Sequence, residues 1–77
     1  MDIRDVFANN LRRLRHAKGL SQEALADAAK INRTYISKLE TAVTYAGLEI
    51  VAKLAAVLEI EPAELLARPA KRERTRR

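Results

Sequence analysis

Three polar side chains, Arg33, Thr34 and Lys38, are spaced so that a helix would carry them on one side. Ile36 and Leu39 fall on the opposite side of the same helix and are expected to face the interior. An arginine can bond guanine O6 and N7 together, a lysine can reach the same atoms, and a threonine methyl group can contact thymine. An α-helix also fits the major groove of B-DNA. These residue types at this spacing therefore indicate a helix that reads base edges.

The surrounding sequence predicts the elements that would hold this helix. Apolar residues recur at helical spacing in five segments, over residues 2–17, 22–29, 33–41, 47–58 and 63–67. Ser21 and Asn32 are suitable N-caps for the second and third helices, Gly19 can end the first, and Pro62 suits the first turn of the fifth. The second and third helices are short and joined by a tight turn, which is typical of a helix-turn-helix. We expect a compact, all-α domain of five helices.

Composition excludes several classes of function. The chain has 77 residues, no cysteine and a single histidine, His16, so we expect no disulfide, no metal site and no cofactor. Neither a paired-carboxylate site nor a Ser/His/Asp arrangement is recognisable, which argues against an enzyme. The longest uncharged stretch, residues 41–48, is far shorter than the roughly 20 residues that span a bilayer. With no apolar signal region near the start, we expect a cytoplasmic protein that does not contact a membrane.

Charge is unevenly distributed along the chain. The net charge is +5 and the pI is about 10.1, which suits a nucleic acid, an anionic membrane or an acidic partner. Residues 1–44 carry a net +3, residues 45–67 a net −3 and residues 68–77 a net +5. We therefore expect a domain over residues 1–67 with a basic half and an acidic half. Residues 68–77 would form a basic, disordered tail.

The fourth and fifth helices contain more large apolar residues than one small core needs, which predicts a second buried face. We expect a homodimer there, through Ile50, Leu54, Val57, Leu58 and Leu65. Two-fold pairing would place two reading helices roughly 34 Å apart and would favour an inverted-repeat site. The alternative is that the first three helices cover all of these residues within one chain.

Particular stretches identify a family. Residues 20–26 (LSQEALA), residues 32–40 (NRTYISKLE) and the pattern of residues 48–66 resemble the lambda-repressor-like (Cro/C1-type, XRE) helix-turn-helix family over about residues 3–67. Small phage-type repressors and restriction–modification controller proteins are the most similar members. The chain departs from the family at Lys30, where the turn usually has glycine. Thr41 and Ala42 likewise follow Glu40 where the family usually has Glu-x-Gly.

The resemblance implies roles for individual residues. Arg33, Thr34 and Lys38 would read bases, although each could instead be a solvated surface residue. A second set would contact phosphates or position the reading helix: Gln22, Ser21, Asn32, Tyr35 and Ser37. Arg15 and Glu40 would form a structural ion pair between the first and third helices. Asn9 and Asn10 are interpreted as helix-surface residues.

These observations predict a sequence-specific regulator that binds double-stranded DNA as a homodimer. Repression needs only this domain, and autoregulation is implied by the resemblance. RNA polymerase or another regulatory protein is a further candidate partner. The alternative is an antitoxin-type interaction module that neutralises a partner protein. A salt-sensitive gel shift would favour the regulator, whereas a toxin that co-purifies stoichiometrically would favour the antitoxin.

Overall fold

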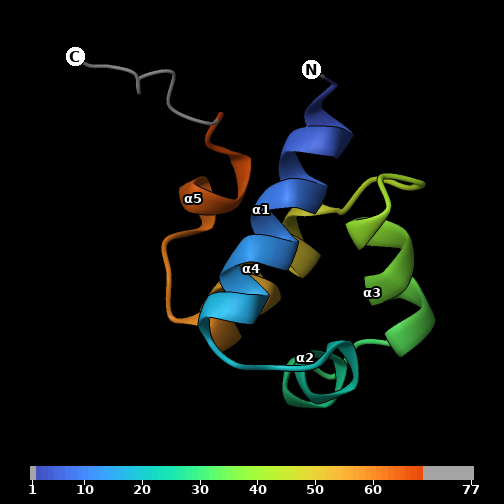
Figure 1. Cartoon of the computed structure of the whole chain (residues 1–77), viewed down its shortest axis with the longest axis vertical. Helices are drawn as coiled ribbons and strands as arrows, with labels where there is room; N and C mark the ends of the chain where they lie inside the picture. The colour runs from blue at the N-terminus through green and yellow to red at the C-terminus, as the bar shows by residue number, and fades with distance from the viewer. Residues whose placement is uncertain (1, 69–77) are drawn as a thin grey trace.

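Five helices joined by short connections make up residues 2–68, the part of the chain that the computed structural model describes (Figure 1). Their bounds are α1 Ile3–Ala17, α2 Gln22–Ala29, α3 Arg33–Glu40, α4 Leu48–Leu58 and α5 Pro62–Leu66. The all-α prediction is confirmed, and each helix begins and ends within about a residue of its expected bounds. Most of the predicted tail, residues 69–77, lies outside the described residues.

Local capping explains why these bounds follow from the sequence. The Ser21 hydroxyl accepts a hydrogen bond from the Ala24 N–H at 3.0 Å and so begins α2. The Asn32 side chain accepts one from the Thr34 N–H at 2.7 Å and begins α3. Each bond satisfies an N–H group that the first turn of a helix leaves without a carbonyl partner. The two helices of the helix-turn-helix are thus positioned by their own caps.

The core lies between all five helices. In Figure 1, α1 is at the centre with α5 and α3 on either side of it, while α2 lies below and α4 behind. The contacts pair α1 with α3 and α5, α2 with α3 and α4, and α4 with α5. Ala26 and Ala29 are buried on α2, and their small side chains allow α2 to approach α3 closely. Larger side chains from every helix complete the core: Phe7, Leu11, Leu25, Ile36, Leu39, Val51, Leu54, Leu58 and Leu65.

This packing corrects the predicted dimer interface. Leu54, Leu58 and Leu65 are only 0%, 4% and 0% exposed, so none of them is available to a second chain. Ile50 and Val57 are half-buried and pack against the same core. The prediction failed because α5 folds back over α1 and α4, and its Leu65 fills the space that a partner would have filled. The assignment of Leu54, Leu58 and Leu65 to an interface was wrong.

Three non-glycine residues hold left-handed backbone conformations at the ends of helices. They are Lys30 after α2, Ala42 after α3 and Glu59 after α4, with φ of 58°, 61° and 60°. A side chain in this conformation costs roughly 1–2 kcal/mol because its Cβ crowds the backbone carbonyl. Lys30 and Ala42 are the departures from glycine that the sequence shows. The chain therefore keeps the sharp turns without the residue that favours them.

Candidate nucleic-acid interface

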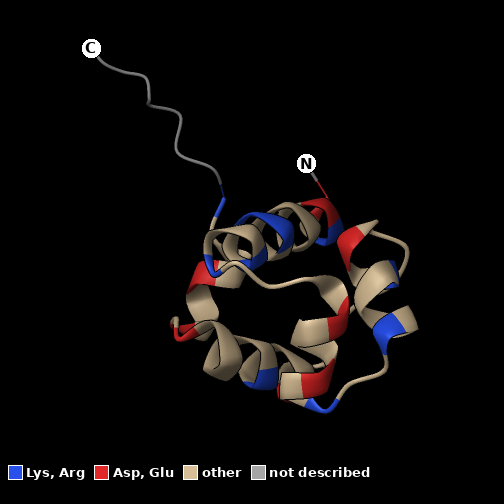
Figure 2. Ribbon diagram, turned by 60° about the horizontal axis from the view of Figure 1, so that its bottom comes forward, with Lys and Arg blue, Asp and Glu red and all other residues tan. Residues whose placement is uncertain are grey.

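The exposed side of α3 carries the residues expected to read bases. Arg33, Thr34 and Lys38 are all exposed, whereas Ile36 and Leu39 on the opposite side are buried. Half-buried Ser37 lies on the same helix. In Figure 2, α3 lies at the right-hand edge of the molecule, with its Lys and Arg positions in blue. The exposed side of α3 therefore presents hydrogen-bond donors to solvent, and two of its side chains, Arg33 and Lys38, are positively charged.

Glu40, the last residue of α3, is the centre of the contacts that hold this helix. Its carboxylate accepts hydrogen bonds from Arg15 Nε at 2.6 Å and Arg15 Nη2 at 3.0 Å, which is a bidentate ion pair between α1 and α3. Gln22 Nε2, at the start of α2, donates to the same carboxylate at 3.0 Å. Glu40 is only 2% exposed, so these donors replace the water it loses. One buried carboxylate thereby joins α3 to both α1 and α2.

The Gln22 amide is thus bonded to the last residue of α3, and its expected role in positioning that helix and contacting a phosphate stays a prediction. The structure also contains the ion pair that the family resemblance implied for Arg15 and Glu40. Arg15 additionally donates from Nη1 to the Leu20 carbonyl at 2.8 Å, which ties down the connection between α1 and α2. α3 is therefore held by hydrogen bonds to α1 and α2 as well as by apolar packing.

Arg12 is a supporting residue that the sequence interpretation missed. One of its guanidinium nitrogens donates to the Glu40 backbone carbonyl, and the other donates to the Asn9 side chain. The contact places a positive charge at the C-terminal end of α3, where the helix dipole is negative. A side chain that bonds a backbone carbonyl leaves no residue pattern, so no sequence signal marked Arg12.

The helix N-termini hold the residues expected near phosphates. Ser21 and Asn32 use their side-chain oxygens to cap α2 and α3. Any phosphate contact there would come from the remaining first-turn N–H groups, which lack helical carbonyl partners and favour an anion. Exposed Lys30 caps the C-terminus of α2, two residues before the N-cap of α3. Its positive charge and the N-terminal dipole of α3 would both attract a phosphate group.

Tyr35 makes a contact that the sequence did not predict. Its hydroxyl donates to the Tyr45 backbone carbonyl at 3.0 Å, in the connection between α3 and α4. A phenol has one O–H proton, so that donor is already used within the chain. The expected phosphate contact of Tyr35 would require this bond to break.

Asn10 corrects another interpretation. It was expected on the helix surface, but it is buried, and its amide donates to the Leu65 carbonyl at 2.9 Å and the Ala67 carbonyl at 2.8 Å. These bonds satisfy carbonyls at the end of α5, which its short helix cannot pair. A signal was present, because position 10 lies one helical turn from Phe7 and from Leu14 on the apolar face. A polar residue on that face indicates a buried hydrogen bond.

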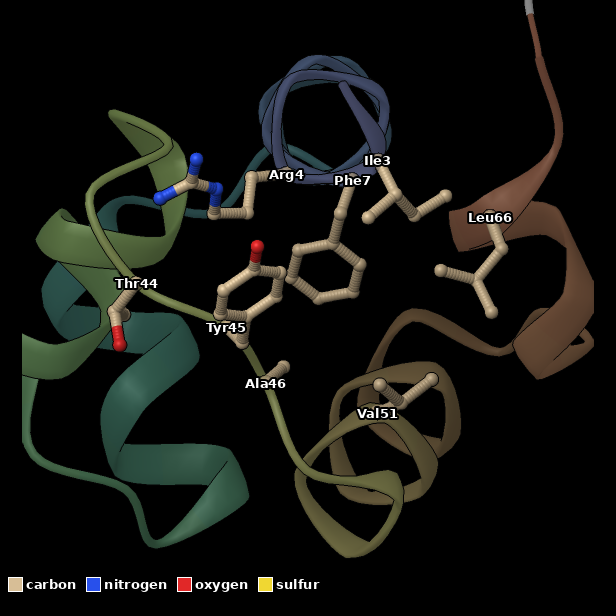
Figure 3. A pocket seen from close by; sticks show the side chains of 8 residues that line it. All are labelled: Ile3, Arg4, Phe7, Thr44, Tyr45, Ala46, Val51 and Leu66. Carbon is tan, nitrogen blue, oxygen red and sulfur yellow. The ribbon is translucent and has the colours of Figure 1, made fainter.

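A second exposed surface is apolar. Five large apolar side chains are exposed within residues 2–68, and we call them the apolar patch: Ile3, Val43, Tyr45, Leu48 and Leu66. Ile3, Tyr45 and Leu66 line a shallow hollow whose floor includes Phe7 and Val51 (Figure 3). The hollow lies where the start of α1, the α3–α4 connection, the start of α4 and the end of α5 meet.

Charged side chains border this hollow. The Arg4 guanidinium lies over the Tyr45 ring, 4.8 Å from its centroid, and also donates to Asp2 at 3.3 Å. The hydrogen bond from Arg4 lowers the pKa of the Asp2 carboxyl, and the same bond raises the pKa of Arg4. On the far side of α4, the ion pair with Lys18 lowers the pKa of Glu59. Both pairs are exposed to solvent.

Within residues 2–68, no three His, Cys, Asp or Glu side chains are grouped so that they could hold a metal ion. None of the helices there is long and apolar enough to cross a membrane. The features that remain are the basic exposed side of α3 and the apolar patch.

Comparisons with known proteins agree with this geometry. The family model described as helix-turn-helix (HTH_3) matches residues 11–65. A hypothetical transcription factor of Neisseria meningitidis is 39% identical over 71 residues, which are 92% of this chain and 67% of that protein. Control protein C.SmaI of Serratia marcescens is 37% identical over 68 residues, which are 88% of this chain and 81% of that protein.

Solved structures show the same arrangement of helices. The crystal structure of the Neisseria hypothetical transcription factor superposes with a TM-score of 0.87 at 39% identity and covers 94% of this chain and 83% of the other. The restriction–modification controller protein C.AhdI of Aeromonas hydrophila gives a TM-score of 0.78 at 44% identity, over 80% of this chain and 94% of the other. Both the matched residues and the exposed α3 lead to one conclusion: the chain belongs to the Cro/C1-type helix-turn-helix family (HTH_3) of non-enzymatic, DNA-binding transcription regulators.

Proposed function

We propose that the protein is a homodimeric repressor that binds an inverted-repeat operator with α3 in the major groove and regulates its own gene. The observation that carries the proposal is the separation of roles on α3. Arg33, Thr34 and Lys38 face solvent, while Glu40 at the end of the same helix is held by α1 and α2. A rigid helix with an exposed set of donors is what base recognition requires.

The base-reading role is tested by selecting bound sequences from random double-stranded DNA. We expect an inverted repeat for the wild-type protein. For Arg33→Ala we expect a loss of about 1–3 kcal/mol that is confined to one base position in each half-site, because one arginine reads one guanine. Lys53→Ala is the matched control, since it removes an exposed positive charge from α4 and should leave the selected sequence unchanged.

Two results would contradict the assignment. Uniform weakening at every position would make Arg33 a phosphate contact rather than a base-reading residue. Selection of no sequence at all by the wild-type protein would remove the operator-binding proposal and would favour the antitoxin-type alternative.

The homodimer is assigned to the apolar patch in place of the buried leucines. Tyr45 is 62% exposed and lines the hollow with Ile3 and Leu66, and Leu48, three residues further along the chain, is 84% exposed. Apolar side chains from several elements that meet on one surface are typical of a protein interface. The connection that carries Val43 and Tyr45 starts at the end of α3. Pairing through it would therefore set the separation of the two α3 helices, which an inverted repeat requires to be about one helical turn of DNA, roughly 34 Å.

Sedimentation equilibrium on the free protein tests this surface with Leu48→Ser. Burying one leucine contributes roughly 1.5–3 kcal/mol, and a two-fold interface contains Leu48 twice, so we expect the dimer dissociation constant to rise at least about a hundredfold. The fold should be retained because Leu48 is outside the core. Ala56→Ser, at an exposed position on the same helix, should pair like the wild type.

A wild-type protein that sediments only as an 8.7 kDa species would disprove the homodimer. A dimer that Leu48→Ser leaves unchanged would instead show that pairing uses another surface. Co-purification of an equimolar unrelated protein, lost in Leu48→Ser, would assign the patch to a different partner.

A further inference from the structure

The connection between α3 and α4 is tied to the reading helix at its midpoint. Tyr35 is half-buried on α3, with its ring packed against the core, and its hydroxyl donates to the Tyr45 carbonyl at 3.0 Å. The two residues are ten positions apart, and the connection between them includes the left-handed Ala42. The start of the connection is also bonded to α3, from the Val43 N–H to the Lys38 carbonyl at 3.0 Å, so the Tyr35 hydroxyl is a second attachment further along the connection.

The same residue, Tyr45, also faces the apolar patch. Its backbone carbonyl bonds α3, while its ring lies beside Phe7 under the Arg4 guanidinium at the rim of the hollow (Figure 3). One residue therefore contacts the reading helix through its main chain and the patch through its side chain. Moving the carbonyl away from Tyr35 would also move the ring within the patch.

We propose that the Tyr35 hydroxyl is a positioning residue for pairing, because it fixes the part of the apolar patch that residues 43–46 supply. This inference rests on the proposed homodimer and specifies which hydrogen bond fixes the conformation of the pairing surface. It also couples pairing to DNA binding. The Tyr35 hydroxyl has one proton to donate. A hydrogen bond from this hydroxyl to a DNA phosphate would therefore break the bond to the Tyr45 carbonyl and release the connection. Conversely, a paired partner that held the connection in place would keep the hydroxyl bonded to Tyr45 and away from the phosphate.

Tyr35→Phe removes the hydroxyl and leaves the ring that packs against the core. We expect the dimer dissociation constant of the DNA-free protein to rise about tenfold, the effect of one hydrogen bond in each protomer. Amide hydrogen exchange should accelerate for residues 43–46 and stay unchanged for the core of α1. Exchange reports the tether directly, and it does not depend on the strength of DNA binding.

Thr41→Val is the matched control. It also deletes one hydroxyl, but that hydroxyl donates to the Ser37 and Lys38 carbonyls, at 3.0 Å and 3.3 Å, within the last turn of α3. We expect this variant to pair like the wild type and to show unchanged exchange over residues 43–46. A general loss of stability would change the dimer dissociation constant and the exchange rates in both variants, whereas loss of the proposed tether would change them only in Tyr35→Phe.

The outcomes separate this inference from the proposed function. A monomeric wild type overturns the homodimer and the inference together. A dimeric wild type whose self-association Tyr35→Phe leaves unchanged overturns the inference alone. Weaker DNA binding by Tyr35→Phe with unchanged pairing would likewise overturn it and make the hydroxyl a phosphate contact.

Discussion

Glu40 shows how a buried charge can serve recognition without touching the ligand. Its carboxylate is bonded by Arg15 from α1 and Gln22 from α2, and its backbone carbonyl is bonded by Arg12. A buried ion pair gives little net stability compared with apolar packing, because both charges lose water. What it provides is direction, since a bidentate guanidinium accepts a carboxylate in only a narrow range of positions. The pair therefore sets where α3 ends relative to α1.

Removing the charge of Glu40 should be costly. Glu40→Gln leaves the Arg15 guanidinium largely buried without its counter-ion, so we expect the free energy of unfolding to fall by about 3 kcal/mol. Urea unfolding followed by circular dichroism measures the change. Asp2→Asn is the control, because it breaks an ion pair with Arg4 that is exposed and should leave stability close to the wild type. A loss in Glu40→Gln no greater than that in Asp2→Asn would mean that the network does not hold α3.

At the scale of the helices, the turns after α2, α3 and α4 share one conformation that their residues disfavour. Lys30, Ala42 and Glu59 have φ near 60°, and the family usually has glycine at the position of Lys30 and near that of Ala42. The backbone is held there by the hydrogen bonds that close each helix end, which run from the Ile31, Val43 and Ile60 N–H groups to the carbonyls of Ala26, Lys38 and Ala55. The fold therefore stores strain at its turns that a glycine would relieve.

Ala42→Gly should stabilise the protein, because the Cβ that crowds the left-handed backbone is removed. The gain is expected to be about 0.5–1 kcal/mol, since the greater freedom of glycine in the unfolded chain offsets part of the relief. Ala52→Gly is a matched control on the exposed side of α4, where the same change should cost about 1 kcal/mol. Thermal unfolding of both variants gives the comparison. A shift of the same sign in both would show that Ala42 is not strained.

The helices could be predicted from the sequence because their signals are local. Ser21 and Asn32 cap the helices they precede, and each bond spans only two or three residues. Local signals could not show which apolar side chains a neighbouring helix covers. Leu65 and Leu66 are adjacent in the sequence, yet the first is in the core and the second lies at the rim of the patch. Only the packing of α5 against α1 separates the two.

The candidate site divides in the same way. The reading set on α3 follows from helical spacing and the family resemblance. Its supports at Asn10, Arg12 and Tyr35 donate to backbone carbonyls on other elements, and a carbonyl has no residue type for a sequence pattern to show. Long-range side-chain to backbone bonds were therefore found only in the structure.

At the scale of the whole molecule, charge is separated within a body that is neutral in sum. Residues 1–44, which include α3, carry a net +3, and residues 45–67, which include α4 and α5, carry a net −3. The net positive charge of the chain is therefore carried by residues 68–77, which have six basic side chains and one acidic side chain. The body can orient toward DNA through this polarity, while the C-terminal residues would add attraction that does not depend on base sequence.

Truncation after Ala67 tests whether residues 68–77 add attraction to DNA that does not depend on base sequence. We expect the slope of log affinity against log salt concentration to become shallower by roughly one unit for each removed residue that neutralises a phosphate. The selected operator sequence should stay the same, because the reading set on α3 is intact. Fluorescence anisotropy between about 50 and 200 mM salt measures the slope. An unchanged slope would show that residues 68–77 do not contact the DNA backbone.

The separation of reading and supporting residues on α3 has a consequence for change over time. Arg33, Thr34 and Lys38 are exposed, while the bonds that hold the helix go to Asn32, Tyr35 and Glu40. Under the proposed base-reading role, new side chains in the exposed set would alter which operator is recognised with little effect on folding. A duplicated copy of the gene could therefore acquire a new target by a few surface substitutions, and a designer could redirect the protein by the same route.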